Sequence, residues 1–157
     1  MSRLTSFDNA AHVLDELINL HEQLAKLYED LATEANRPLS KMLLDFLVSR
    51  EKKLADTLER YADNAPDKVL KTWIQIPYPE DPEAFLQEFV TGASADMEPL
   101  QVYELGEKAD DFVARLLSHV HERCEIKEVK ALFADLMQGE RNENIALSKA
   151  YNSLREM

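Results

Sequence analysis

Four side chains that could hold a metal ion occupy positions where helical periodicity predicts burial. In the last long apolar pattern of the chain, residues 132–154, apolar residues recur at steps of three and four, and the rhythm passes through Glu140 and Glu143. The same spacing places Glu51 and His21 on the apolar stripes of two earlier helices. Such a stripe lies on one face of a helix and packs against a core. We therefore expect three carboxylates and one imidazole to face the interior.

Burial of these carboxylates favours a positive charge beside them. An unpaired buried carboxylate costs several kcal/mol, and neighbouring carboxylates repel one another. A divalent cation held by His21, Glu51, Glu140 and Glu143 would remove both costs. Hard oxygen ligands with one imidazole suit iron, manganese or zinc. The sequence therefore predicts a site for one divalent metal ion, with a metal-free polar cluster as the alternative.

The same residues allow three metal-free arrangements. One or two carboxylates could be protonated, with raised pKa values. His21 could instead be protonated and bridge two carboxylates. The helices could also rotate so that the glutamates reach solvent, where Arg50, Lys53 or Arg141 could pair with them.

The composition excludes several classes of function. The formal net charge of −12 at pH 7 argues against nucleic acid, whose binding depends on Lys and Arg, and against an anionic membrane surface. A single cysteine, Cys124, leaves no disulfide framework and no four-cysteine metal site. Only three glycines in the chain leave no glycine-rich phosphate loop.

The length predicts a single domain over residues 1–157, with a hydrophobic core of its own. No apolar run approaches the roughly 20 residues that cross a bilayer. Residues 1–17 also lack the apolar core of a signal peptide. We therefore expect a cytoplasmic protein.

Four long helices must position the candidate side chains. After a loose lead-in at residues 1–6, Ser6 or Asp8 is suited to cap the first helix. Pro38 is suited to the first position of the second helix. The expected helices cover residues 8–35, 38–64, 99–121 and 128–154, to within a few residues at each end.

Residues 66–96 differ in kind and are expected to form a crossover between two helical hairpins. Prolines in the first part favour an extended chain. Asp81 and Pro82 then fit the cap and first position of one short extra helix that ends near Val90. Trp73 and its neighbours are expected to pack over the outside of the bundle.

The first helix carries a second apolar stripe, which widens its apolar face. Val13, Leu20 and Leu27 form this stripe. A wide apolar face indicates a buried helix or a second contact surface. We therefore expect a homodimer, and an unknown protein partner is a further candidate.

The two pairs of long helices align with each other as an internal repeat. The first helix aligns with the third at an offset of 85, which pairs His21 with Gly106. The second aligns with the fourth at an offset of 89, which pairs Glu51 with Glu140. The four extra residues fall in the turn of the second hairpin, where an insertion costs little. Two hairpins joined by a long crossover predict an all-α four-helix bundle of the ferritin-like class.

On these features the chain resembles rubrerythrin-type, ferritin-like proteins across nearly its whole length, least closely in the crossover. In that family each hairpin supplies one Glu from its first helix and a Glu-x-x-His pair from its second, and together they hold two irons. The corresponding positions are His21 and Gly106 for the first-helix glutamates, and Glu51 with Leu54 and Glu140 with Glu143 for the pairs.

The resemblance implies a diiron site that keeps only part of its ligand set. The two glutamates of the Glu-x-x-His pairs remain, whereas both histidines and both first-helix glutamates are replaced. The rubredoxin-type cysteines that carry electrons in such peroxidases are also missing.

We therefore expect a ferritin-like, non-enzymatic protein with a degenerate diiron site, with or without one divalent metal ion. One alternative is a di-metal oxidoreductase that acts on oxygen or peroxide. In it His21 would replace a glutamate, Glu143 a histidine, and Glu107 would swing in as the missing ligand. Another alternative is a pure interaction or scaffold protein, with the wide face of the first helix and residues 73–78 as its contact surface.

Overall fold

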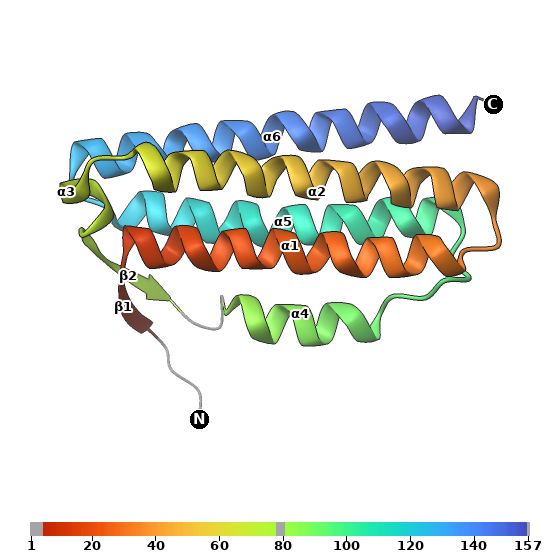
Figure 1. Ribbon diagram of the computed structural model, residues 1–157, viewed down its shortest axis with the longest axis horizontal. Coiled ribbons are helices and arrows are strands. Elements are labelled where there is room, and N and C mark those ends of the chain that lie inside the picture. Colours follow the sequence, from red (N-terminus) through yellow and green to blue (C-terminus); the bar gives the residue numbers. More distant parts are fainter. Residues whose placement is uncertain (1–4, 78–80, 157) are drawn as a thin grey trace.

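The computed structural model describes residues 5–77 and 81–156 and is dominated by four long helices that lie side by side (Figure 1). α1 and α2 form one antiparallel hairpin, and α5 and α6 form the other. α2 and α5 run in the same direction, because the crossover returns along the length of the molecule (Figure 1). The bounds are Ala10–Glu34 for α1, Pro38–Asn64 for α2, Pro99–Arg123 for α5 and Lys127–Arg155 for α6. The predicted all-α class is confirmed.

Local signals explain where the long helices begin. Asn9 caps α1, and its Oδ1 accepts a hydrogen bond of 2.8 Å from the backbone N–H of His12. The sequence predicted Ser6 or Asp8 as the cap. The observed cap therefore lies one residue after Asp8. Pro38 occupies the start of α2 as expected, because proline lacks the N–H that would be unpaired there. Pro99 does the same for α5.

The two hairpins match in register more closely than the sequence alignment predicted. α5 begins 89 residues after α1, and α6 begins 89 residues after α2. Each hairpin turn has three residues, 35–37 and 124–126, so the second turn contains no insertion. The predicted offset of 85 for the first pair of helices is therefore wrong by about one helical turn. The counterpart of His21 is Asp110 and not Gly106.

The crossover contains a strand that pairs with the beginning of the chain. α3 (Asp67–Leu70) is followed by β2 (Trp73–Pro77), which pairs antiparallel with β1 (Thr5–Asn9). The predicted extended segment in the crossover is thus confirmed. The predicted loose lead-in is wrong for residues 5 and 6, because they belong to β1. Residues 1–4 of that lead-in and residues 78–80 of the crossover lie outside the described residues.

The short extra helix α4 (Pro82–Thr91) is confirmed, and it covers the side of α1 and α5. Its predicted cap is also confirmed, since Oδ1 of Asp81 accepts a hydrogen bond from the N–H of Glu83. Phe85 of α4 stacks on Phe112 of α5, with ring centroids 4.1 Å apart. Phe89 of α4 and Tyr28 of α1 pack edge to face. Through these contacts α4 packs against α1 and α5 and covers one side of the hydrophobic core.

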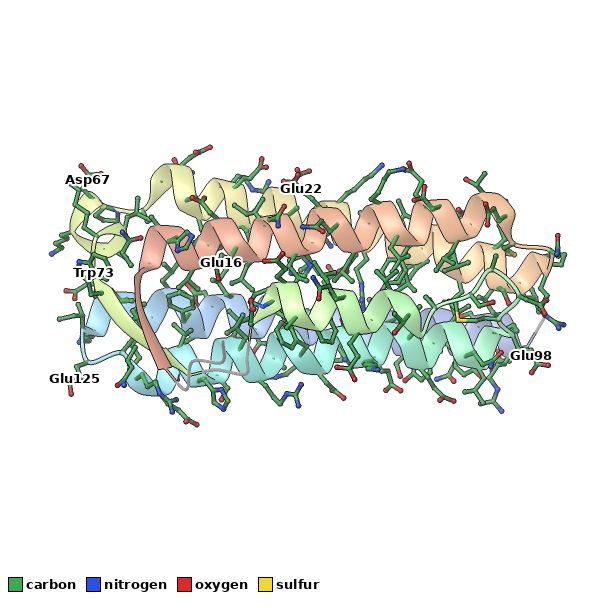
Figure 2. All side chains as sticks on the ribbon, turned by 90° about the horizontal axis from the view of Figure 1, so that it is seen from below. Glu16, Glu22, Asp67, Trp73, Glu98 and Glu125 are labelled. Atoms are coloured by element: carbon green, nitrogen blue, oxygen red, sulfur yellow. The ribbon has the colours of Figure 1, made fainter. Side chains whose placement is uncertain are left out.

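This cover accounts for the wide apolar face of α1. Val13 and Leu20 are buried and Leu27 is partly buried within the single chain. The width of the face therefore does not require a second subunit, and the homodimer stays a prediction. Ile74 is buried, but Trp73 is 68% exposed, near the end of the molecule where Asp67 and Glu125 lie (Figure 2). Among the described residues, no helix is long and apolar enough to cross a membrane.

Candidate functional site

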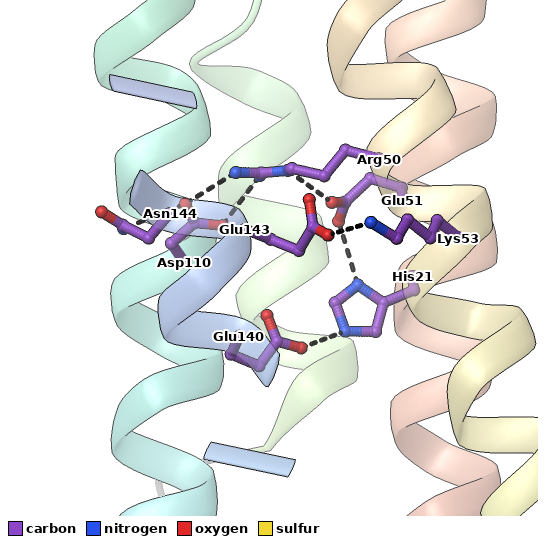
Figure 3. A network of polar contacts seen from close by, with 8 residues as sticks. All are labelled: His21, Arg50, Glu51, Lys53, Asp110, Glu140, Glu143 and Asn144. Atoms are coloured by element: carbon purple, nitrogen blue, oxygen red, sulfur yellow. Dashed lines mark hydrogen bonds and ion pairs between the residues drawn. The ribbon is translucent and has the colours of Figure 1, made fainter. Parts of the chain in front are cut away.

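His21 links two of the predicted glutamates in the centre of the molecule (Figure 3). Its Nδ1 atom lies 3.0 Å from Oε1 of Glu51, and its Nε2 atom lies 2.8 Å from Oε1 of Glu140. His21 and Glu51 are 1% exposed, and the side chain of Glu140 is 11% exposed. Both ring nitrogens thus face carboxylate oxygens. Two N–H donors satisfy this arrangement, which is the geometry of a protonated imidazole.

Arg50 extends the cluster from Glu51 to α5. Its Nε donates to Oε2 of Glu51 at 3.3 Å. Its two terminal nitrogens donate to the two carboxylate oxygens of Asp110 at 2.8 and 2.9 Å. Asn144 of α6 donates to the same carboxylate at 3.1 Å. Arg50 is 2% exposed, so this is a buried bidentate ion pair, the strongest class of such contacts.

Glu143 is 14% exposed and pairs with a lysine, while no hydrogen bond or ion pair joins it to the other cluster residues that the structure describes (Figure 3). Its Oε1 lies 2.7 Å from Nζ of Lys53, whose side chain is 69% exposed. The pattern of residues 132–154 predicted an inward direction for Glu143, and its side chain is indeed mostly buried. Residues 140 and 143 nevertheless differ by 60° around the helix axis. That rotation takes Glu143 to the edge of the buried stripe, where the Lys53 ammonium can reach it.

The two central glutamates change the acidity of His21. Burial alone would lower its pKa, but the charges of Glu140 and Glu51 and their hydrogen bonds outweigh burial and raise the pKa to about 10. The effect on Glu51 is reciprocal. Burial alone would raise the pKa of Glu51, but His21 and Arg50 lower it below its usual value. The two residues therefore form a charged pair at neutral pH.

For Asp110, in contrast, burial outweighs the effect of the neighbouring positive charge on the pKa. Burial raises the pKa of Asp110 to about 7, with a smaller contribution from Glu51 and Glu140, although Arg50 acts to lower it. The nominal charges explain this result. His21 and Arg50 bring two positive charges, whereas Glu51, Asp110 and Glu140 bring three negative ones. One negative charge of the cluster therefore has no positive partner within it.

Tyr28 lies close enough to this cluster to respond to its charges. Burial, together with the charge of Glu51, raises the pKa of Tyr28 well above its ordinary value. Its hydroxyl is buried and has no hydrogen-bond partner among the described residues. An unpaired buried hydroxyl is costly, so Tyr28 adds a polar atom to the core that the protein itself does not satisfy.

Three of the four predicted site residues, His21, Glu51 and Glu140, are therefore joined by direct contacts, whereas the contact of Glu143 is with Lys53. Within the residues that the structure describes, no group of three or more His, Cys, Asp or Glu side chains is arranged to hold a metal ion. The contacts match one of the metal-free arrangements considered from the sequence, in which a protonated His21 bridges two carboxylates. The one-metal site stays a prediction.

Gly106 belongs to the apolar packing and not to the polar cluster. A Cβ atom at Gly106 would lie 3.0 Å from Cδ2 of Leu147 and 3.1 Å from Cδ2 of Leu47. The glycine thus allows α5 to approach leucines of α2 and α6 closely. Asp110, one turn later, occupies the level that the sequence alignment assigned to Gly106.

Sequence reasoning missed Arg50, Asp110 and Asn144 as members of the cluster. Arg50 was considered only as a possible surface partner of the glutamates. It lies three residues after Leu47, an inward position, and this spacing could have indicated burial. An offset of 89 for both helix pairs would have aligned Asp110 with His21. No comparable signal identifies Asn144.

Two cavities flank Glu140. One, of about 100 Å³, is bounded by leucines of all four long helices and by Gly139. The other, of about 150 Å³, lies between α5 and α6 and includes Asp110 and Asn144 in its lining. Glu140 therefore joins the buried cluster to space that a small solute can enter.

Comparison with protein-family models, with curated proteins and with solved structures finds no match to this chain. The site is therefore interpreted from its own geometry.

Proposed function

We propose that this chain is a ferritin-like, non-enzymatic protein whose central site is held by internal ion pairs in place of metal ions. The observation that carries this proposal is the pair of contacts from His21 to Glu51 and Glu140. A carboxylate needs a positive partner in a core, and here His21 and Arg50 supply positive charge directly. Neither charge depends on a metal ion.

The ferritin-like part of the proposal is supported by the connectivity. Two antiparallel hairpins, a crossover that returns along the length of the molecule, and equal helix registers match the arrangement of that class. When the two hairpins are aligned at an offset of 89 residues, His21 and Asp110 correspond to the first-helix glutamates of the family. Glu51 and Glu140 correspond to the glutamates of its Glu-x-x-His pairs. In a ferritin-like chain, this register would put the cluster at the level of the irons.

The chemistry of the cluster favours a non-enzymatic role over a di-metal oxidoreductase. That alternative needed Glu107 as an extra ligand, but Asp110 is the α5 residue in the cluster, and both its oxygens already accept hydrogen bonds from Arg50. A guanidinium remains charged at every physiological pH. A dication beside Arg50 would be repelled by it.

A second candidate is a protein that binds one divalent ion, iron, manganese or zinc, through His21, Glu51, Glu140 and Glu143. Its support is that two carboxylates already converge on one imidazole. Binding would require His21 to lose at least one proton and Glu143 to leave Lys53. Both steps oppose the interactions described above.

The test is metal content per chain, measured by plasma mass spectrometry on protein purified without chelators or a histidine tag. A variant with Glu51→Gln and Glu140→Gln is measured beside it. We expect less than a tenth of an equivalent in both samples. Near one equivalent, lost in the variant, would establish the one-metal candidate, and near two equivalents of iron would revive the oxidoreductase.

Nitrogen NMR of the His21 ring supplies a direct measurement of the same proposal. A protonated ring gives two similar N–H nitrogen signals, whereas a metal-bound ring has one nitrogen without a proton. We expect the protonated pattern at neutral pH. Light scattering on the same sample tests the proposed homodimer, and fractionation of cells that express the protein tests the proposed cytoplasmic location.

A further inference from the structure

Glu140 closes the inner end of a narrow cavity whose walls are otherwise mostly apolar. The cavity has a volume of about 100 Å³. This is smaller than the engineered cavity of roughly 150 Å³ that holds benzene, so it favours a thin chain over a ring. The polar residues in its lining are Thr57, Tyr61, Asp135 and Glu140. The leucines are Leu17, Leu54, Leu58, Leu117 and Leu136.

The cavity meets a wider surface groove of about 650 Å³ between the end of α2, α3 and the start of α6. Tyr61 and Asp135 line both spaces, so the groove and the cavity adjoin at these two side chains. The groove floor is apolar and includes Val69 and Leu132. A molecule with an apolar body could therefore lie in the groove and extend inward.

Gly139 keeps the inner space open. A Cβ atom at this position would meet no heavy atom within 4 Å among the described residues. Gly139 lies in the middle of α6, where glycine costs about 1 kcal/mol relative to alanine. No close helix approach explains this glycine, in contrast to Gly106. The missing side chain instead leaves room beside Glu140.

The inner carboxylate has one oxygen available. Oε1 of Glu140 accepts the hydrogen bond from His21, and no hydrogen bond joins Oε2 to another described residue. The side chain keeps 11% exposure, so solvent or a small solute can reach it. A carboxylate in the lining of a mostly apolar cavity attracts a cation or a strong hydrogen-bond donor.

The charged residues that line the cavity and the groove also favour a cation as the ligand. The central cluster carries one negative charge more than its positive charges balance. Asp135, and Glu128 at the groove, form no ion pair with another described residue, whereas Arg60 at the groove already donates to Thr57 at 3.2 Å. A ligand with a carboxylate would meet three acids, Glu140, Asp135 and Glu128, and one cation, Arg60.

We propose that the cavity and groove bind a linear aliphatic amine in its ammonium form. The ammonium group lies at the carboxylate of Glu140, and the hydrocarbon chain passes Leu54 and Leu58 into the groove at Tyr61. The inference deepens the proposed function and rests on it, because a metal ion at Glu140 would compete for the same carboxylate. In this proposal, a monovalent organic cation binds the Glu140 carboxylate, which is the part of the metal-free cluster that borders the cavity.

The test is calorimetric and NMR titration of metal-free protein at neutral pH with n-hexylammonium chloride, n-hexanol and sodium hexanoate. We expect saturable binding of the amine, weaker binding of the alcohol and none of the hexanoate. Amide shifts should concentrate at Leu54, Tyr61 and Gly139. Glu140→Gln should weaken amine binding on the order of tenfold or more, because it removes a charge-assisted hydrogen bond.

Gly139→Leu provides a test that leaves the ion pairs intact. The added side chain fills the inner cavity and should abolish amine binding. Gly92→Leu is the matched control, because Gly92 ends α4, away from the cavity, and a Cβ there would make only an ordinary contact of 3.7 Å with Phe89. This control should bind the amine as the unmodified protein does.

Each outcome separates this inference from the proposed function. Absence of amine binding, or amine binding that survives Gly139→Leu, overturns the ligand assignment. Equal affinity for hexanol and hexylammonium overturns the role of Glu140 as the anchor. If the chain as purified carries a metal ion, the metal-free function fails, but amine binding to the stripped protein would still support the site.

Discussion

Arg50 of α2 and Asp110 of α5 form a bidentate ion pair across the boundary between the two helical hairpins, with nitrogen–oxygen distances of 2.8 and 2.9 Å. The pair is buried, and Arg50 also contacts Glu51, which in turn contacts His21. A fixed guanidinium thus orients carboxylates that belong to different hairpins. The polar centre is therefore part of what sets the hairpins against each other.

Arg50→Met should destabilise the protein by about 3–5 kcal/mol, because it leaves two buried carboxylates with fewer positive partners. The measurement is urea unfolding followed by circular dichroism. The double variant Arg50→Met with Asp110→Leu is the control, and it should lose less than the sum of the single variants. A loss below about 1 kcal/mol for Arg50→Met would mean that the pair behaves like one at the surface.

The free energy of unfolding should fall as pH rises from about 7 to 9.5. The pKa of His21 is raised from 6.5 to about 10, where burial acts to lower it but Glu140 and Glu51 dominate. A raised pKa stabilises the folded protein below the unfolded value, and the effect is lost as pH rises through the folded value. The slope for one proton reaches about 1.4 kcal/mol per pH unit.

His21→Asn is the control for this pH dependence, because it keeps a polar side chain but removes the titrating ring. Urea unfolding at several pH values should give a flatter profile for the variant than for the unmodified protein between about pH 7 and 9.5. Parallel profiles would show that His21 does not carry a proton in the folded state.

Leucine substitutions at two helical glycines should have opposite effects. Gly106→Leu should destabilise the protein by about 1–3 kcal/mol, because a Cβ there already meets Leu147 and Leu47 at 3.0 and 3.1 Å. Gly139→Leu should be neutral or stabilise by up to about 1 kcal/mol, because the space is open and leucine favours a helix. Thermal unfolding of both variants checks this, and equal destabilisation would contradict the assigned packing.

Glu143→Gln and Glu140→Gln should differ in their cost, although both residues were predicted to face inward. Glu143 is 14% exposed, but its lysine partner is mostly exposed, and ion pairs that solvent can reach contribute about 0–1 kcal/mol. Glu140 contacts buried His21, and its neutralisation should cost about 1–3 kcal/mol. The comparison is made by urea unfolding at neutral pH. A larger cost for Glu143 would place it in the central cluster after all.

Much of the fold could be predicted from the sequence because its signals are local. Apolar spacing located the four long helices, and Pro38 and Asp81 with Pro82 marked two helix starts that the structure confirms. The pairing of β1 with β2 could not be predicted in this way, because the two strands are separated by more than sixty residues. No periodic signal joins segments so far apart.

The candidate site was predicted only in part, for a physical reason that differs between residues. His21, Glu51 and Glu140 interrupt apolar stripes, and such interruptions can be seen in a sequence. The position of Asp110 depends on the register of the second hairpin, and a shift of four residues keeps nearly the same helix face inward. Apolar spacing alone therefore could not distinguish Asp110 from Gly106.

The charges of the central cluster are unequally divided between the two hairpins. The first hairpin brings both cations, His21 and Arg50, with one acid, Glu51, whereas the second brings only the acids Asp110 and Glu140. Two copies of the second hairpin would place four buried acids together, and two copies of the first would leave an excess of positive charge. Only the combination of one first hairpin with one second hairpin brings the net charge of the cluster close to zero. The unequal division therefore disfavours the pairing of like hairpins from two chains during folding, and it favours contact between a first and a second hairpin.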